Sequence, residues 1–289
     1  LHTIGVVLPY MPIHHQLFDH LETPAIVLTS GNLSSEPIVR DNDEALSRLG
    51  PISDLVVTYD REIHNRLDDS VAMVCAARPR VLRRARGYVP TPIGLPFSVD
   101  GILAMGPEQK NTLCLGSGCN AILSQHIGDV ATAETFAFFD EVRARLPALF
   151  KHHPCLIAVD SHPDYLPSQA GRELGLPVVE VGHHHAHIAS CLAENGVTER
   201  VIGVALDGTG YGEDGRIWGG EFLLAGMESS TRQAHFAYVP IPGGDLAAAH
   251  PWRSAFAYLH HAYPEGLPES AQALPLFDER SIRPEELDA

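Results

Sequence analysis

Hydrophobic residues in the first ninety positions occur in short runs separated by polar turns. The runs at 3–10, 25–32, 55–61 and 70–77 have the length of strands. Two stretches between them carry apolar residues at helical spacing. These are residues 13–21 and 42–50, the second with Asp41 or Asn42 as a candidate N-cap and Gly50 as a stop signal. Strands that alternate with helices predict an α/β layer.

After residue 88 the pattern changes. A stretch rich in proline and glycine, 88–101, is typical of a linker. The remainder predicts a second α/β region with two units that each read as strand, glycine turn and strand, at 112–129 and at 200–226. Two such units indicate an internally duplicated fold. The other elements expected are helices at 133–150, after 182 and at 247–263, and strands at 155–160 and 177–182.

Charge and cysteine content exclude several classes of protein. The net charge of −16 disfavours general affinity for nucleic acid or an anionic membrane. One local exception is a group of five arginines, namely Arg78, Arg80, Arg83, Arg84 and Arg86. The five cysteines form no CxxC pair, so each is expected to be a small buried hydrophobe. No signal peptide pattern or apolar run of about 18 residues occurs, so a cytoplasmic setting is expected.

Four histidines within five positions follow the strand predicted at 177–182. His183 and His187 have the i, i+4 spacing that puts two imidazoles on one helix face, where both can reach one metal ion. His184 and His185 point elsewhere and are expected to support the ligands from behind, to cap the helix or to be exposed. A polar helix start without metal is the alternative, and a third ligand would be needed for a zinc or iron site.

Two loops offer groups that suit a nucleotide. Asp207 ends an apolar run, and Gly208 and Gly210 would let backbone N–H groups approach an anion, although a plain turn explains the glycines equally well. Residues 212–215 predict a tight hairpin turn. Residues 29–37 also carry hydroxyl and amide groups after a predicted strand, with a hydrogen-bonded turn as the alternative. A P-loop is excluded, and GxGxxG is absent, so a Rossmann site has no support.

Seven of these segments, in this order, resemble the HypF family of hydrogenase-maturation carbamoyltransferases. They are LPYMPIHHQLF, TSGNLSSEPI, NRLDDSV, RRARGYVP, LSQHIGD, HHHAHIA and LDGTGYGEDGRIWGGEF, and the resemblance runs from residue 3 to about 260. It implies the C-terminal part of a YrdC-like α/β domain at 1–92, a linker at 93–100, and at 101–289 the N-terminal part of an ASKHA-type domain, the duplicated fold of actin and sugar kinases. The chain is accordingly expected to be a fragment.

The resemblance also implies a reaction. Carbamoyl phosphate is hydrolysed to carbamate, the YrdC-like domain uses ATP with Mg²⁺ to form carbamoyl adenylate and pyrophosphate, and the second domain transfers the carbamoyl group to the C-terminal cysteine of a HypE-type protein. The family's later metal-ligating Asp is expected beyond Ala289, so the chain alone is expected to be inactive.

The residue roles implied by the resemblance fall into two sites. His183, His187 and Asp207 would ligate a divalent zinc or iron ion, with Asp207 also taking part in catalysis. Beside this metal, in the transfer domain, Gly208 and Gly210 would frame the phosphates of a nucleotide, with Lys110 as a weaker candidate. In the YrdC-like domain, Ser30, Asn32 and Ser70 would bind the adenylate-forming nucleotide, with Arg83 or Arg84 near its phosphates.

Two other functions stay open from the sequence. Relatives of the same two-domain type carbamoylate the oxygen of a small molecule. The second is a degenerate YrdC-like module that binds RNA or a protein and catalyses no reaction. The arginine group supports this function, and the overall negative charge opposes it.

Overall fold

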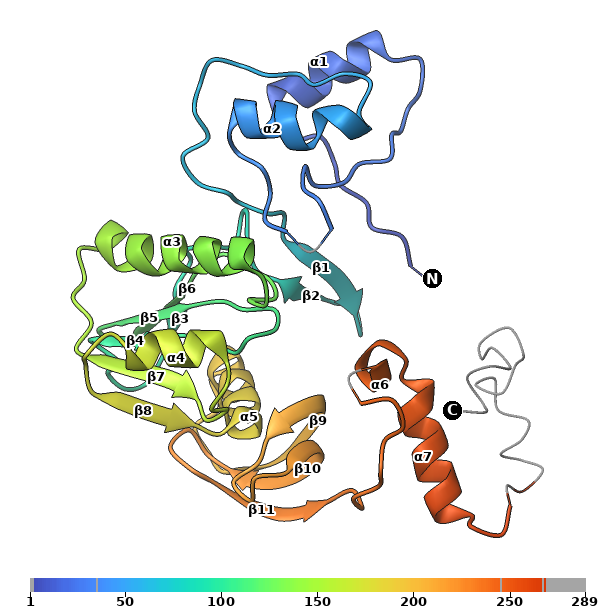
Figure 1. The fold of residues 1–289 in the computed structure, drawn as a ribbon. Coiled ribbons are helices and arrows are strands. Elements are labelled where there is room, and N and C mark those ends of the chain that lie inside the picture. The colour runs from blue at the N-terminus through green and yellow to red at the C-terminus, as the bar shows by residue number, and fades with distance from the viewer. Residues whose placement is uncertain (1–2, 35, 245, 267, 269–289) are drawn as a thin grey trace. The chain divides into compact units, whose positions relative to one another are not determined.

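The computed structural model describes residues 3–34, 36–244, 246–266 and 268. The chain divides into two compact units, Leu1–Asp68 and Asp69–Ala289, which are described separately (Figure 1). Helices and strands are both present, so the mixed α/β class predicted from the sequence is confirmed.

The described part of the first unit contains helices and extended loops. Its elements are α1 (Pro12–His20), α2 (Asn42–Arg48) and the 3₁₀ helix η1 (Gly50–Ile52). The side chain of Asp41 accepts hydrogen bonds from the N–H groups of Asp43 and Glu44, which confirms it as the N-cap of α2.

The strands predicted at 3–10, 25–32 and 55–61 are wrong, because the described residues there form no ladder. A strand needs a partner for its backbone groups, and no described segment of this unit pairs with these runs. Their apolar side chains are exposed, as in Ile4 and Val27, so these runs have the composition of strands without a sheet to join.

The second unit begins with a two-stranded hairpin, β1 (Val71–Cys75) and β2 (Arg78–Arg83). A strand at 70–77 was predicted and is confirmed. Ala76 and Ala77 take positive φ at the turn between the two strands.

A six-stranded sheet follows, in the order β3-β6-β5-β4-β7-β8. Its strands are β3 (Ile93–Gly94), β4 (Ile102–Ala104), β5 (Cys114–Ser117), β6 (Asn120–Leu123), β7 (Leu156–Asp160) and β8 (Val178–Val181). β4, β7 and β8 are parallel, whereas β3, β6, β5 and β4 pair antiparallel. β3 lies in the proline-rich stretch, so part of that stretch enters the sheet as an edge strand.

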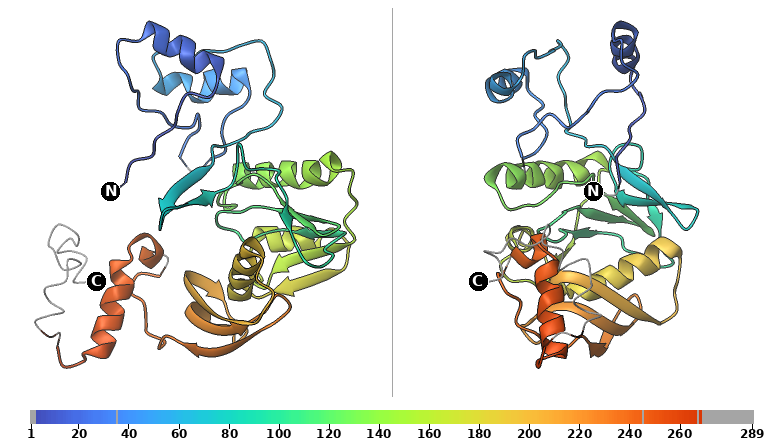
Figure 2. Two further views of the ribbon diagram at one scale, coloured as in Figure 1. Left: turned by 180° about the vertical axis from the view of Figure 1, so that it is seen from behind. Right: turned by 90° about the vertical axis from the view of Figure 1, so that its right-hand side faces the viewer.

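Two helices cover this sheet, α3 (Ala133–Leu149) and α4 (Leu166–Arg172). Figure 2 shows α3 lying along the sheet. Phe139 of α3 and Ala170 of α4 share one buried core with Leu115 and Ile157 of the strands. α3 was predicted and starts at a capping box formed by Thr132 and Thr135, whereas α4 was not predicted.

A second sheet has the order β11-β10-β9 and packs against the histidine helix. The elements are α5 (His183–Asn195), β9 (Val201–Tyr211), β10 (Ile217–Ala225) and β11 (Ser230–His235). Ile188 and Leu192 of α5 form a buried cluster with Ala205, Trp218 and Leu223 of the sheet. The predicted hairpin turn at 212–215 is confirmed, with Gly215 at φ +72°.

The last described helices are α6 (Leu246–Ala249) and α7 (Trp252–Ala262), so the single helix predicted at 247–263 is interrupted near Pro251. Among the described helices, none is long and apolar enough to cross a membrane.

The expectation of buried cysteines is wrong for four of the five. Cys75, Cys119, Cys155 and Cys191 are exposed, and all five are free thiols. Cys114 lies on β5, and burial raises the pKa of its thiol to about 11.

Candidate metal centre

The two histidines predicted as metal ligands lie at the start of α5 and face the same carboxylate. Helical spacing puts His183 and His187 one turn apart, with their Nε2 atoms separated by 3.2 Å. Oδ2 of Asp207, on β9, lies 2.9 Å from Nε2 of His183 and 3.3 Å from Nε2 of His187. One ligand atom from each residue lies within 4.8 Å of the other two.

A bulge in β9 turns Asp207 toward the helix. Leu206 pairs with Gly220 and Gly210 pairs with Trp218, so three residues of β9 lie opposite Gly219 alone. Such bulges bend a strand and redirect its side chains. A Cβ at position 219 would lie 2.8 Å from the carbonyl oxygen of Asp207, so glycine is required for this close approach.

The glycine residues predicted as a phosphate loop lie within this strand. Gly208 and Gly210 belong to β9, so the backbone directly after Asp207 is an extended strand and not the plain turn that was the alternative reading. The N–H of Gly208 donates to Oδ1 of Asp207 at 2.7 Å. A Cβ at position 210 would lie 2.4 Å from Cε1 of His184, whereas nothing lies within 4 Å of a Cβ at position 208. Gly210 therefore lets α5 approach β9, and Gly208 leaves open space beside Asp207.

Asp160 is a site residue that the sequence analysis missed. It ends β7, and its Oδ2 lies 2.6 Å from Nδ1 of His183. Because a carboxylate accepts, Nδ1 of His183 carries the proton and Nε2 faces Asp207. The signal available in the sequence was an acidic residue at the carboxyl end of a buried parallel strand, where ligands gather in α/β sheets.

The charges of these residues are coupled. Hydrogen bonds to Asp160 and then to Asp207 raise the pKa of His183 to about 9, against the opposing effect of burial. Burial acts to raise the pKa of Asp207, but hydrogen bonds from His183 and His187 outweigh it and hold that pKa well below its usual range. In the metal-free protein the imidazole of His183 is therefore protonated, and its positive charge lies between the carboxylates of Asp160 and Asp207.

The donor set fits a divalent transition metal. Two imidazole nitrogens and one carboxylate oxygen are ligands that zinc and iron accept. Tetrahedral ligands at about 2.0–2.1 Å from zinc are about 3.3 Å apart, close to the separations of 2.9–3.3 Å found here. Asp207 is placed where it could supply the third ligand that the histidine spacing alone left open.

An aromatic cluster lies close to Asp160 and was also missed. The ring of His162 stacks on Tyr165 at 4.0 Å and meets Tyr211 edge-on at 5.3 Å. Burial, together with the carboxylates of Asp160, Glu108 and Asp207, raises the pKa of Tyr165 to about 12. This phenol therefore keeps its proton and remains a hydrogen-bond donor near the site.

The other two histidines have separate environments. His184 is buried, and its ring lies next to Trp218 and Gly210. Nε2 of His185 lies 2.9 Å from the carbonyl oxygen of Gly226. Neither contacts Asp207 through a hydrogen bond among the described residues.

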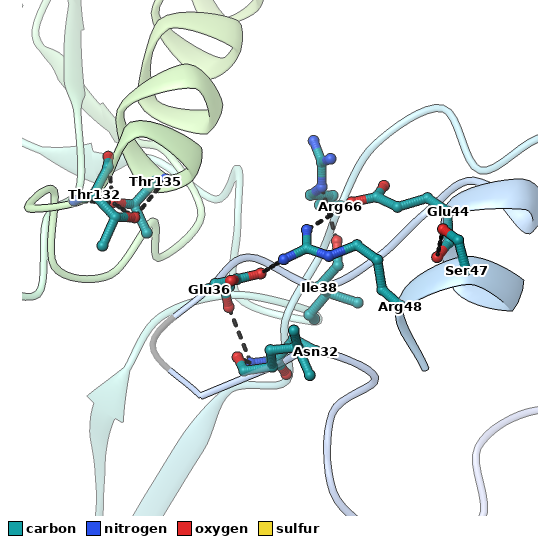
Figure 3. A network of polar contacts seen from close by, with 10 residues as sticks. Asn32, Glu36, Ile38, Glu44, Ser47, Arg48, Arg66, Thr132 and Thr135 are labelled. Carbon is teal, nitrogen blue, oxygen red and sulfur yellow. Dashed lines mark hydrogen bonds and ion pairs between the residues drawn. The ribbon is translucent and has the colours of Figure 1, made fainter. Parts of the chain in front are cut away.

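The residues predicted to bind the adenylate-forming nucleotide lie elsewhere in the chain. In the first unit, the side-chain amide of Asn32 donates to the carbonyl oxygen of Glu36 (Figure 3). It also donates to the carbonyl oxygen of Leu33, and the backbone N–H of Asn32 donates to the carbonyl oxygen of Ser30. Glu36 also pairs with Arg48. The structural alternative, a hydrogen-bonded turn, therefore describes these contacts.

In the second unit, the hydroxyl of Ser70 donates to the carbonyl oxygen of Arg86 and accepts from the N–H of Ala85. Arg83 ends β2. Arg84 follows it, and its buried Nε has no hydrogen-bond partner among the described residues. Lys110 lies between β4 and β5 at φ +49°, and its N–H donates to Asp129.

Comparisons with known proteins show which families the parts of the chain match. Residues 98–194 match a family model described as the HypF Kae1-like domain, and residues 203–286 match one described as the second subdomain of a carbamoyltransferase Kae1-like domain. Residues 1–85 match the Sua5/YciO/YrdC model, described as telomere recombination. The metal triad takes its histidines from the first Kae1-like match and Asp207 from the second.

Full-length relatives are similar in sequence and in structure. The chain is 43% identical to carbamoyltransferase HypF of Rhizobium leguminosarum bv. viciae over 90% of this chain and 35% of that protein. It is 45% identical to carbamoyltransferase HypF of a Synechocystis species over 89% of this chain and 34% of that protein. A crystal structure of full-length HypF in the phosphate- and nucleotide-bound form superimposes with a TM-score of 0.84 and 46% identity, over 90% of this chain and 41% of that one. The chain spans about a third of the length of these two sequence relatives (35% and 34%).

Proposed function

The chain belongs to the HypF family, and on that basis we propose that it forms part of a carbamoyltransferase of [NiFe] hydrogenase maturation. In this proposal, carbamoyl phosphate supplies carbamate, ATP converts it to carbamoyl adenylate with release of pyrophosphate, and the carbamoyl group passes to the C-terminal cysteine of a HypE-type protein. The free thiols of all five cysteines support a cytoplasmic setting.

The proposed division of the chain is a YrdC-like part at 1–92, a linker at 93–100 and an ASKHA-type part at 101–289. Family matches at 1–85, 98–194 and 203–286 support it. The ASKHA-type part would carry out the transfer, and the YrdC-like part would bind the adenylate-forming nucleotide.

One observation carries the proposal, namely that His183, His187 and Asp207 converge from α5 and β9. A zinc or iron ion held by them would act as a Lewis acid on a phosphate or carbamoyl oxygen. Asp160 orients His183 by accepting from its Nδ1–H, and Gly208 leaves space beside Asp207 for the reacting group. His187, with 55% of its side chain exposed, forms the open side of the site.

For the nucleotide of the adenylation step, the proposal gives the main role to the arginines. Asn32 and Ser70 already use their side chains to hold backbone turns, as described above. One guanidinium group can donate two parallel hydrogen bonds to the oxygens of a phosphate. The buried Nε of Arg84, which has no hydrogen-bond partner among the described residues, supports a phosphate contact there. Mg²⁺ would accompany the triphosphate. Ser30 and Arg83 remain candidates for the same nucleotide, whereas Gly210 and Lys110 remain candidates for a nucleotide in the ASKHA-type part.

The test is pyrophosphate release by the longest natural polypeptide that carries this sequence, supplied with ATP and carbamoyl phosphate. We expect release that requires both compounds, and carbamoylation of a HypE-type C-terminal cysteine detected by mass spectrometry. Release without protein carbamoylation, but with carbamoylation of an added small alcohol, would favour the small-molecule alternative. A folded protein that releases no pyrophosphate would contradict the proposal.

A further inference from the structure

His184, the neighbour of the metal ligand His183, is buried without a hydrogen-bond partner. It is 1% exposed, and neither ring nitrogen has a partner among the described residues. Buried polar groups are almost always paired, because leaving one unpaired is costly. A leucine or phenylalanine would fill the space at lower cost, so the contacts of this ring need an explanation.

Those contacts join the first turn of α5 to the sheet that carries Asp207. The ring centroid of His184 lies 5.8 Å from that of Trp218 on β10. On β9, the ring of His184 packs against Gly210. A Cβ at position 210 would lie 2.4 Å from Cε1 of His184, so only glycine leaves room for the ring there. The first turn of α5 therefore rests on β9 and β10 through His184.

Trp218 is itself held by charged groups. Its Nε1–H donates to Oδ1 of Asp214 at 2.8 Å. The guanidinium carbon of Arg232, on β11, lies 4.1 Å from the indole ring, a cation–π distance. Nε of Arg232 donates to Glu221 at 2.6 Å, and Glu221 is 2% exposed. Two carboxylates and one guanidinium thus fix the indole from outside the metal site.

We propose that Trp218 and Arg232 are positioning residues for the metal site, acting through His184. They would hold the first two turns of α5, which carry His183 and His187, at a set distance from the bulge that carries Asp207. Ligands on separate elements must be held within about 0.5 Å of the productive geometry. Arg232 lies on β11, and the strand β10 separates it from β9, which carries Asp207. It nevertheless determines where Trp218 lies, and through Trp218 where His184 lies. This inference rests on the proposed metal site.

The test measures metal affinity and ligand geometry, with Co²⁺ as the probe. The sequence has two tryptophans, so Trp252→Phe leaves Trp218 as the only indole and allows its fluorescence to be followed. In that background, Arg232→Met removes the guanidinium. Arg145→Met is the matched control, since Arg145 pairs with Glu141 along α3 and not with the Trp218 cluster.

We expect Co²⁺ to change Trp218 emission, and Arg232→Met to weaken Co²⁺ binding about tenfold or more and to alter the visible absorption of bound Co²⁺. Arg145→Met should change neither. Trp218→Phe, in the unsubstituted background, keeps a ring but loses the donor to Asp214, and it should weaken binding in the same direction if Arg232→Met does not fold.

The inference is overturned if both substitutions lower thermal stability but leave Co²⁺ affinity and absorption unchanged, because the cluster is then merely structural. If the unsubstituted chain takes up no Co²⁺, the proposed metal site is overturned and this inference with it. The two failures are distinguishable, because the unsubstituted chain reports on the site and the variants report on the positioning.

Discussion

Oδ2 of Asp160 lies 2.6 Å from Nδ1 of His183, and this contact determines which ring nitrogen of His183 faces Asp207. The strand β7 that carries Asp160 belongs to the six-stranded sheet, whereas Asp207 belongs to the other sheet. His183 is hydrogen-bonded to both carboxylates, so its ring joins the six-stranded and the three-stranded sheet at the candidate metal site. Carboxylates that orient a ligating histidine in this way commonly change metal affinity 10- to 100-fold.

The first prediction concerns the pH dependence of metal binding. In the metal-free chain Asp160 and Asp207 keep His183 protonated up to its pKa of about 9, so a bound metal must displace that proton. The affinity for Zn²⁺ should therefore rise about tenfold per pH unit between about pH 6.5 and 8.5. Asp160→Asn removes the larger cause of the raised pKa, so the rise should flatten in the upper part of this range.

Competition titrations with a coloured chelator at three pH values measure this slope. Glu180→Gln is a suitable control, because Glu180 pairs with Arg172 on the surface. Equal slopes in Asp160→Asn and the unsubstituted chain would show that Asp160 does not control the proton on His183.

The second prediction concerns the stability of the metal-free chain. A histidine whose pKa is raised on folding stabilises the protein fully below its ordinary pKa of about 6.5, and this contribution is lost as pH rises through the folded value, here about 9. The lowered pKa of Asp207 adds stability only above the ordinary pKa of an aspartate, so it is constant in this window. Chelator-treated protein should thus lose about 2 °C or more of Tm between pH 6.5 and 9.5.

Thermal unfolding followed by circular dichroism measures this loss, and His183→Gln provides the comparison. The difference between the two proteins isolates His183 from other groups that titrate. A difference in Tm that stays constant from pH 6.5 to 9.5 would argue against the ion pairs with Asp160 and Asp207.

The third prediction compares two glycines of β9. Gly210→Ala places a methyl group 2.4 Å from Cε1 of His184, so α5 and β9 must separate, at a cost of about 1–3 kcal/mol in the free energy of unfolding. Gly208→Ala meets open space and should leave the free energy of unfolding nearly unchanged. Urea denaturation of both variants gives the comparison, and equal losses would contradict the close packing of His184 on β9.

The fourth prediction concerns thiol reactivity. Because the pKa of Cys114 is about 11, roughly one of its thiols in a thousand is ionised at pH 8, and its partial burial also limits access. Exposed Cys75 should react with iodoacetamide long before Cys114 in the native protein. Mass spectrometry of alkylated peptides over time gives the two rates, and urea should make them similar. Comparable native rates would show that β5 is not packed as described.

The histidine pair could be predicted because helical periodicity alone puts residues i and i+4 on one face. Asp207 could be singled out because it follows an apolar run and precedes two glycines. The direction of its side chain, however, depends on a bulge opposite Gly219. That bulge arises from the pairing of β9 with β10, which the sequence of either strand alone does not reveal. Asp160 was missed because its partner, His183, is 23 residues away along the chain. The strands expected near Ile4 and Val27 show the converse error, since strand composition does not supply a pairing partner.

The zinc content of the protein after equilibrium dialysis shows whether His183, His187 and Asp207 form one metal site. We expect about one zinc ion per unsubstituted chain and strongly reduced zinc in His187→Ala and in Asp207→Asn, while His185→Ala retains zinc because His185 contacts Gly226 instead. Equal zinc content in all four proteins would show that these three residues do not form a zinc site.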